Sequence, residues 1–122
     1  MAINASQLEQ ELGHFTGTEH HYRIRPSLLG TDGVKYLAEQ AECFWLLDLY
    51  WSHLLGIDHN TNPFTVLKMT VQQSSAYVAI EDGNDNVLAS QLVEYTDFPL
   101  ASITLYGCWS ERDWVLMLTS EY

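Results

Sequence analysis

Basic residues are scarce in this sequence. Five lysines and arginines stand against sixteen aspartates and glutamates, which gives a formal net charge of −11. A negative surface disfavours direct binding to the phosphate backbone of a nucleic acid. An acidic composition often serves solubility alone. The sharper interpretation is an acidic face that meets a basic protein partner.

Cysteines and long apolar runs are also few. The two cysteines, Cys43 and Cys108, lie in dissimilar contexts, one in a helical pattern and one after a strand, and are predicted to be free thiols. No stretch has the roughly 18 uninterrupted apolar residues of a membrane span, and the first residues lack the basic and apolar parts of a targeting segment. We therefore expect a cytoplasmic protein without membrane contact.

Motifs for catalysis, metals and cofactors are absent too. The glycines are isolated turn residues, so the sequence has no glycine-rich phosphate loop. The five histidines show no zinc-binding spacing, and His20 and His21, as neighbours in an extended segment, point to opposite faces. Neither Cys108 nor Ser110 has a sequence neighbour that would activate it as a nucleophile. The sequence predicts no metal, no cofactor and no catalytic residue.

Apolar residues are plentiful enough for one folded domain. With 122 residues, of which 47% are apolar and 17% charged, the chain can bury one hydrophobic core. We predict a single α+β domain over residues 1–122. A short helix is expected from Gln7 to Leu12, begun by a Ser6–Glu9 capping box and ended at Gly13, and an edge strand is expected at 20–24.

The middle of the chain has the pattern of one long amphipathic helix. From Val34 to Leu55 there is no proline or glycine, and Thr31 offers an N-cap side chain. At about 100° per residue, the core face is expected to consist of Val34, Leu37, Ala38, Ala41, Phe44, Trp45, Leu49 and Ser52. The second half has a further apolar patch on the opposite side, which is either buried or a candidate interface, made of Leu46, Leu47, Tyr50 and Leu54.

The remainder of the chain has the pattern of a sheet. Segments rich in β-branched and aromatic residues alternate with turn-like connections such as residues 82–86. The predicted strands are Phe64–Gln72, Ala76–Glu81, Val87–Tyr95, Ala101–Tyr106 and Trp114–Thr119. Short consecutive connections favour an antiparallel meander of about five strands, on which the long helix packs. In the second strand, alternation puts Ala76, Val78 and Ile80 on one face.

Three side chains are candidates for function on physical grounds. Asp48 lies near the edge of the apolar helix face, where a buried carboxylate needs a partner. It is interpreted either as a structural acid paired with a basic group, or as a general base or ligand in a pocket between helix and sheet. Trp109 and Trp114 flank a polar turn, and are either exposed anchors for a protein contact or rings packed under the loop.

Several short strings, taken in order, resemble a family of short bacterial proteins associated with plasmids, phages and other mobile elements. They are Phe15–Glu19, Tyr22–Arg23, Thr31–Glu39, Trp45–Asp48, Asp82–Asn84, Tyr95–Leu100 and Ser120–Tyr122. The resemblance covers nearly the whole chain and carries no assigned activity, cofactor or catalytic residue with it. It implies a mobile-element setting and draws attention to Asp32, Asp48, Asp82 and Asp97. Asp32 is also explained as an acid at a helix N-terminus, and Asp82 and Asp97 as turn formers.

These features favour a non-enzymatic protein-interaction module of a mobile element, an acidic inhibitor of a host defence or nucleic-acid-handling protein. The alternative is a small enzyme or ligand-binding domain with a pocket around Asp48, assisted by Tyr36 or a nearby histidine. A third hypothesis is self-assembly, with a homodimer built on the apolar patch that contains Leu46 and Leu47.

Overall fold

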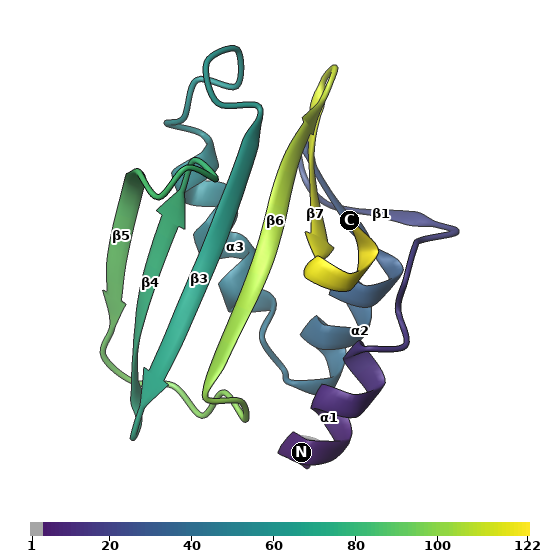
Figure 1. Ribbon diagram of the computed structural model, residues 1–122, viewed down its shortest axis with the longest axis vertical. Coiled ribbons are helices and arrows are strands. Elements are labelled where there is room, and N and C mark those ends of the chain that lie inside the picture. The colour runs from purple at the N-terminus through teal and green to yellow at the C-terminus, as the bar shows by residue number, and fades with distance from the viewer. Residues whose placement is uncertain (1–3) are drawn as a thin grey trace.

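The computed structural model describes residues 4–122 and has an α+β fold (Figure 1). Its described part contains three α-helices, one 3₁₀ turn and a seven-stranded sheet. The helices are α1 (Ala5–Leu12), α2 (Asp32–Gln40) and α3 (Phe44–Leu54), and the 3₁₀ turn is η1 (Thr119–Glu121). The strands are β1 (His21–Arg25), β2 (Leu28–Thr31), β3 (Phe64–Gln72), β4 (Ser75–Glu81), β5 (Val87–Val93), β6 (Ser102–Ser110) and β7 (Asp113–Leu118).

The sheet is mixed, and the predicted five-stranded antiparallel meander is wrong. The strand order is β1-β2-β7-β6-β3-β4-β5, with β2 and β7 parallel and the other pairs antiparallel. The five predicted strands are all present, but β6 pairs with β3 instead of β5. The segment between β5 and β6 passes the β3–β4 turn, where Thr96 N donates to Ser74 O at 2.7 Å, and it buries Phe98 and Leu100. Burial of these two side chains holds the connection that carries the chain from β5 past β4 to the far side of β3.

The long helix predicted from Val34 to Leu55 is also wrong, because the chain breaks at Ala41–Cys43. Glu42 adopts a left-handed conformation with φ 53°, which no continuous helix permits. Cys43 N donates to Ala38 O at 3.0 Å, and the Cys43 side chain is fully buried. Cys43 is buried at the junction between the two helices, and the buried positions of α3 do not continue the helical period of α2.

The change of phase alters which side of α3 faces the sheet. In α2 the predicted core positions Val34, Leu37 and Ala38 are buried. In α3 the predicted core positions Trp45 and Leu49 are only half-buried, while the fully buried side is Leu46, Leu47, Tyr50 and Leu54. These four residues pack in the core of their own chain, so they are not an interface for a partner or a second copy.

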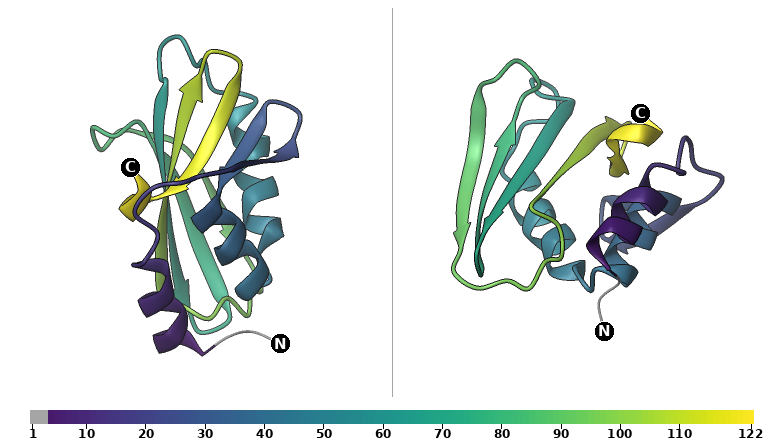
Figure 2. Two further views of the ribbon diagram at one scale, coloured as in Figure 1. Left: turned by 90° about the vertical axis from the view of Figure 1, so that its right-hand side faces the viewer. Right: turned by 60° about the horizontal axis from the view of Figure 1, so that its bottom comes forward.

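Helices α2 and α3 cover one face of the sheet, and in the described part of the chain no helix covers the other face of β3, β4 and β5 (Figures 1 and 2). The predicted alternation in β4 is confirmed, since Ala76, Val78 and Ile80 are buried and Tyr77 is exposed. We call the uncovered side of the sheet the open face. Strands β3, β4 and β5 therefore have one face packed against the helices and one face toward solvent.

The N-terminal elements differ from the prediction in detail. Helix α1 is confirmed with its predicted end at Leu12 and Gly13 as the C-cap, but it begins at Ala5, two residues before the predicted start. Its N-cap is Asn4, whose Oδ1 accepts from Ser6 N at 2.9 Å, and not Ser6. The predicted edge strand is β1, at one edge of the sheet. Strand β2 is missing from the prediction because it has only four residues, and its pairing with β7 joins distant parts of the chain.

Candidate functional site

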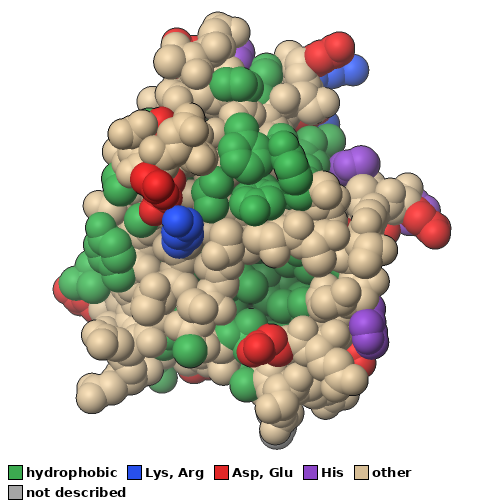
Figure 3. All heavy atoms as spheres, in the orientation of Figure 1, with side chains coloured by type: hydrophobic (Ala, Val, Ile, Leu, Met, Phe, Trp, Pro, Cys, Tyr) green, Lys and Arg blue, Asp and Glu red, His purple; other side chains and the backbone are tan. Residues whose placement is uncertain are grey.

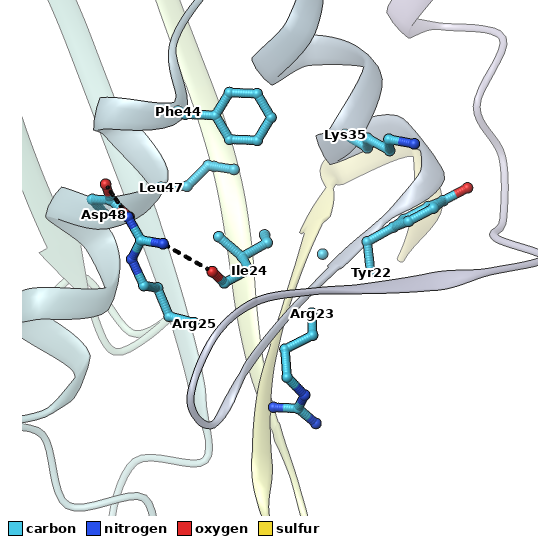
Figure 4. A pocket seen from close by; sticks show the side chains of 9 residues that line it. Tyr22, Arg23, Ile24, Arg25, Lys35, Phe44, Leu47 and Asp48 are labelled. Carbon is cyan, nitrogen blue, oxygen red and sulfur yellow. Dashed lines mark hydrogen bonds and ion pairs between the residues drawn. The ribbon is translucent and has the colours of Figure 1, made fainter.

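A cavity of about 470 Å³ lies between β1 and the two helices α2 and α3 (Figure 4). The helix break before α3 leaves Phe44 at the mouth, with 48% of its surface exposed, instead of filling the space. Ile24 and Leu47 form an apolar floor between two polar walls (Figure 4). The lining consists of Tyr22, Arg23, Ile24, Arg25, Gly30, Lys35, Phe44, Leu47 and Asp48.

One polar wall is an ion pair between β1 and α3. Arg25 Nη2 lies 3.0 Å from Asp48 Oδ2, and Arg25 Nη1 donates to Ile24 O at 3.2 Å. The Asp48 side chain is 43% exposed. Asp48 is therefore paired with one of the few basic groups, as its structural interpretation predicts, and it also lines the pocket of the alternative hypothesis. The described lining contains no histidine, cysteine or serine.

The other polar wall is Lys35 on Tyr22. The Lys35 ammonium lies 4.3 Å from the centroid of the Tyr22 ring, a cation–π contact. A hydrogen bond to the Asp32 carboxylate is the main cause that raises the pKa of Tyr22. Arg23 belongs to the lining, but its guanidinium points away from the cavity and pairs with Asp113 at 3.2 Å (Figure 4). The charged side chains at this cavity are therefore Lys35, Arg25 and Asp48.

Asp32 organises the turn before β1. Its Oδ2 accepts from Glu19 N at 2.9 Å, and its backbone N–H donates to Thr18 Oγ1 at 2.9 Å. The hydrogen bond from Glu19 N is the main cause that lowers the pKa of Asp32. At the N-terminus of α2 the negative carboxylate also interacts favourably with the positive end of the helix dipole. These contacts explain Asp32 as a structural residue.

Glu121, which the sequence analysis does not single out, caps the same helix from the far end of the sheet. Its carboxylate accepts from Thr31 Oγ1 at 2.6 Å, Gly33 N at 3.0 Å and Leu118 N at 2.9 Å. A Cβ at Gly33 would lie 2.6 Å from Glu121 Oε1, so only glycine fits beside this carboxylate. The contact holds η1 against α2. The contact of Glu121 with α2 has no local sequence signal, because Thr31 and Gly33 lie 90 and 88 positions from Glu121.

The two tryptophans, for which the sequence leaves open exposed anchors or rings packed under a loop, lie at the core of the protein. Trp114 is only 4% exposed, and its ring meets Trp109 edge-on with centroids 5.5 Å apart. His59, from the loop after α3, stacks on Trp109 at 3.8 Å. These are rings packed under a loop, the second of the two interpretations, and Trp114 offers no exposed surface to a partner.

An aromatic cluster does occur on the open face. Phe64, Tyr106 and Tyr122 form a triangle in which the ring centroids lie 5.1 Å (Phe64–Tyr106), 5.4 Å (Phe64–Tyr122) and 5.2 Å (Tyr106–Tyr122) apart. We call these three residues the aromatic triad. Tyr122 is 77% exposed, and Figure 3 shows a hydrophobic cluster in the upper middle of this face. The rings come from β3, β6 and the residue after η1, so pairing and tertiary contacts must be known before they can be grouped.

The two remaining aspartates of the resembling strings lie in connections. Asp82 forms an Asx turn, since its Oδ1 accepts from Asn84 N at 2.7 Å, and hydrogen bonds led by that from the Asn86 side chain lower its pKa. Asp97 is exposed between β5 and β6, next to Thr96, whose Oγ1 accepts from Phe98 N at 3.1 Å. The structure does not bring Asp32, Asp48, Asp82 and Asp97 together into one site.

Metal and membrane sites were searched over residues 4–122. No group of three or more histidine, cysteine, aspartate or glutamate side chains in this part could hold a metal ion. None of its helices combines the length and apolarity needed to span a membrane.

Comparison with known proteins identifies the family of the chain. No curated protein and no solved structure is significantly similar to the chain. A family model, described as a family of unknown function (DUF6876), matches residues 6–122. Because this match spans nearly the whole sequence, the protein belongs to that family.

Proposed function

We propose that this protein is a non-enzymatic interaction module that binds a positively charged protein through the open face of its sheet. The observation that carries the proposal is the aromatic triad of Phe64, Tyr106 and Tyr122. Large aromatic side chains dominate the binding energy of many protein interfaces, because each buries a large area at a small cost in side-chain entropy. This cluster, with Tyr122 exposed and Phe64 and Tyr106 half-buried, is therefore the anchor that we assign to the partner.

The shape of the open face supports a protein partner. The aromatic rings project from a broad sheet surface, and a protein partner can cover such a surface more fully than a small ligand can. Tyr77 of β4 and Leu92 of β5 are a directly opposed cross-strand pair that adds apolar surface, with both side chains exposed. Phe64 and Tyr106 of the triad lie on the same continuous sheet as this pair (Figure 1).

Charge supports a basic partner. The β4–β5 turn lies against Phe64, as shown by the 3.0 Å that would separate a Cβ at Gly83 from the Phe64 ring. This corner carries Glu81, Asp82 and Asp85 against one lysine, Lys68, which pairs with Glu81 at 3.0 Å. With a net charge of −11 over the chain, acidic residues at one corner of the aromatic triad favour a cationic partner surface.

We further propose that the setting is a mobile element and that the partner is a host protein for defence or nucleic-acid handling. The resembling strings support the setting, and the acidic surface supports the partner, because proteins that handle nucleic acids present basic surfaces. The protein would then compete with nucleic acid for such a surface. Recovery of a partner with no basic surface and no such role would contradict this part of the proposal.

The test is quantitative affinity purification from the native host with a matched set of single variants. Tyr122→Ser and Tyr106→Ser each remove a ring of the triad, whereas Tyr95→Ser removes a tyrosine that is 75% exposed, close to the 77% of Tyr122, and outside the triad. We expect one host protein that is enriched with wild type and Tyr95→Ser and depleted with both triad variants. Its recovery should fall as salt rises from about 50 to about 500 mM, because salt screens exposed charges. The proposal fails if no recovered protein depends on the triad.

A further inference from the structure

The cavity beneath β1 lies on the other side of the sheet from the aromatic triad, and the proposed function does not use it. We propose that it is a binding site for a small organic anion, a carboxylate carried on a flat apolar body. The cavity holds about 470 Å³, within the range of about 300–1,000 Å³ that is typical of small-molecule sites.

The apolar part of the ligand is specified by the floor and mouth of the cavity. Ile24 and Leu47 lie side by side between the polar walls, and Phe44 stands at the mouth (Figure 4). Phe44 is 48% exposed although it is a large apolar ring at the start of a helix. A flat ligand on Ile24 and Leu47 would cover part of this ring and remove apolar surface from water.

The charge of the ligand is specified by the walls. The chain has five basic residues, and the charged groups of two of them, Arg25 and Lys35, flank this cavity (Figure 4). The lining holds one carboxylate, Asp48, so basic groups outnumber acidic ones among the lining side chains of a protein with a net charge of −11; the Asp32 carboxylate lies behind this wall, at the Tyr22 hydroxyl.

Lys35 is the group that we assign to the anion. Among residues 4–122 no carboxylate lies within ion-pair distance of its ammonium, which rests instead on the Tyr22 ring. Arg25 contributes less, because Asp48 and Ile24 O already accept from its guanidinium. A ligand carboxylate at Lys35 would make a charge-assisted hydrogen bond that residues 4–122 do not supply to this lysine.

The experiment is an NMR titration of the full chain with three probes that share a naphthalene ring and differ in charge. They are 1-naphthoate, the neutral 1-naphthamide and the cationic 1-naphthylmethylammonium. We expect 1-naphthoate to shift the amide signals of Tyr22, Ile24 and Leu47 saturably, and to bind about three to ten times more tightly than 1-naphthamide.

Two variants and a control decide the role of Lys35. Lys35→Gln is expected to abolish the preference for 1-naphthoate over 1-naphthamide, and Lys35→Glu to reverse it in favour of 1-naphthylmethylammonium. Arg112→Gln removes a positive charge from the exposed β6–β7 turn, outside the cavity lining, and is expected to leave the preference unchanged. An amide spectrum with wild-type dispersion shows that each variant is folded. Absence of saturable shifts at the cavity, or an unaltered charge preference in Lys35→Glu, overturns the proposal.

Discussion

The Glu121 carboxylate accepts a hydrogen bond from the backbone N–H of Gly33 at 3.0 Å, and thereby joins η1 to the first turn of α2. Thr31 and Leu118 donate to the same carboxylate. Because Tyr122 directly follows Glu121, this contact also sets the position of the most exposed ring of the aromatic triad. A structural contact on the edge of the helix layer thus supports the proposed binding surface on the open face.

Replacement of Glu121 by alanine should therefore lower stability. Three donors lose a charged acceptor, and hydrogen bonds to charged groups contribute about 1.5–3 kcal/mol each in net terms. Because Glu121 is only half-buried, water can replace part of the lost acceptor. We expect the free energy of unfolding to fall by about 2–4 kcal/mol in urea denaturation. Glu9→Ala, on the exposed side of α1, is the control and should change it by less than about 0.5 kcal/mol. Equal effects of the two variants would contradict the capping role.

The pKa of Asp32 is lowered from 3.8, mainly by the hydrogen bond from Glu19 N, so the folded state favours the charged carboxylate. Its contribution to stability is fully present above the unfolded value of 3.8 and is lost as pH falls through the lower pKa of the folded state. Asp32→Asn should thus be less stable than wild type at neutral pH, with a difference that narrows below about pH 4. Urea denaturation at several pH values measures it. A difference that stays constant to about pH 2.5 would rule out this linkage.

The two thiols should differ in reactivity. Burial raises the pKa of Cys43 from 9.0 to about 12, and the side chain has no exposed surface. Cys108 is only half-buried, and burial raises its pKa as well. We expect iodoacetamide at about pH 8 to alkylate Cys108 well before Cys43 in the native protein, and both at similar rates in urea, as read by mass spectrometry. Faster native labelling of Cys43 would show that the junction between α2 and α3 opens.

The buried hydroxyl groups of Tyr50 and Thr65 form a hydrogen bond whose donor can be tested by mutation. Thr65 Oγ1 donates to Gly107 O at 3.0 Å, so at the 2.8 Å contact the Tyr50 hydroxyl is the donor to Thr65 Oγ1. Thr65→Val leaves the Tyr50 hydroxyl buried without an acceptor, and should cost about 2–3 kcal/mol. Tyr50→Phe leaves the Thr65 bond to Gly107 intact and should cost about 1 kcal/mol. Thermal or urea unfolding compares the two, and the reverse ranking would show that the donor assignment is wrong.

Local pattern predicts the strands well and their order poorly. Alternation along β3 and β4 is a property of adjacent residues, so Phe64–Gln72 is predicted with the bounds it has. The pairing of β6 with β3 depends on burial of Phe98 and Leu100 in the connection, which no local pattern states. The parallel contact of β2 with β7 is likewise a long-range property.

In the helix region, too, local pattern predicts some features correctly and misses others. Val34, Leu37 and Ala38 follow the predicted period because α2 is regular. Glu42 has a high intrinsic helix propensity, so the sequence gives no local indication of its left-handed conformation. Once the helix breaks there, every face assignment after it is displaced, which is why Leu46 and Leu47 face the core and Asp48 reaches the cavity rim.

The candidate sites divide in a similar way. Asp48 is found from sequence because a carboxylate in an apolar stretch is conspicuous, and its need for a basic partner is a local argument. The aromatic triad and the Glu121 contact are assembled from segments far apart in the chain. The residues of these two sites cannot be recognised as neighbours from the sequence, because their proximity depends on the order of the strands.

The central claim, binding of a basic partner at the aromatic triad, is tested most directly by the dissociation constant of the purified partner for three forms of the protein. These are wild type, Tyr122→Ser and Tyr95→Ser, whose two tyrosines are nearly equal in exposure. Loss of an aromatic anchor should weaken binding at least about tenfold, equivalent to about 1.4 kcal/mol, in Tyr122→Ser alone. Equal dissociation constants for wild type and Tyr122→Ser, or equal weakening by Tyr95→Ser, would contradict the account.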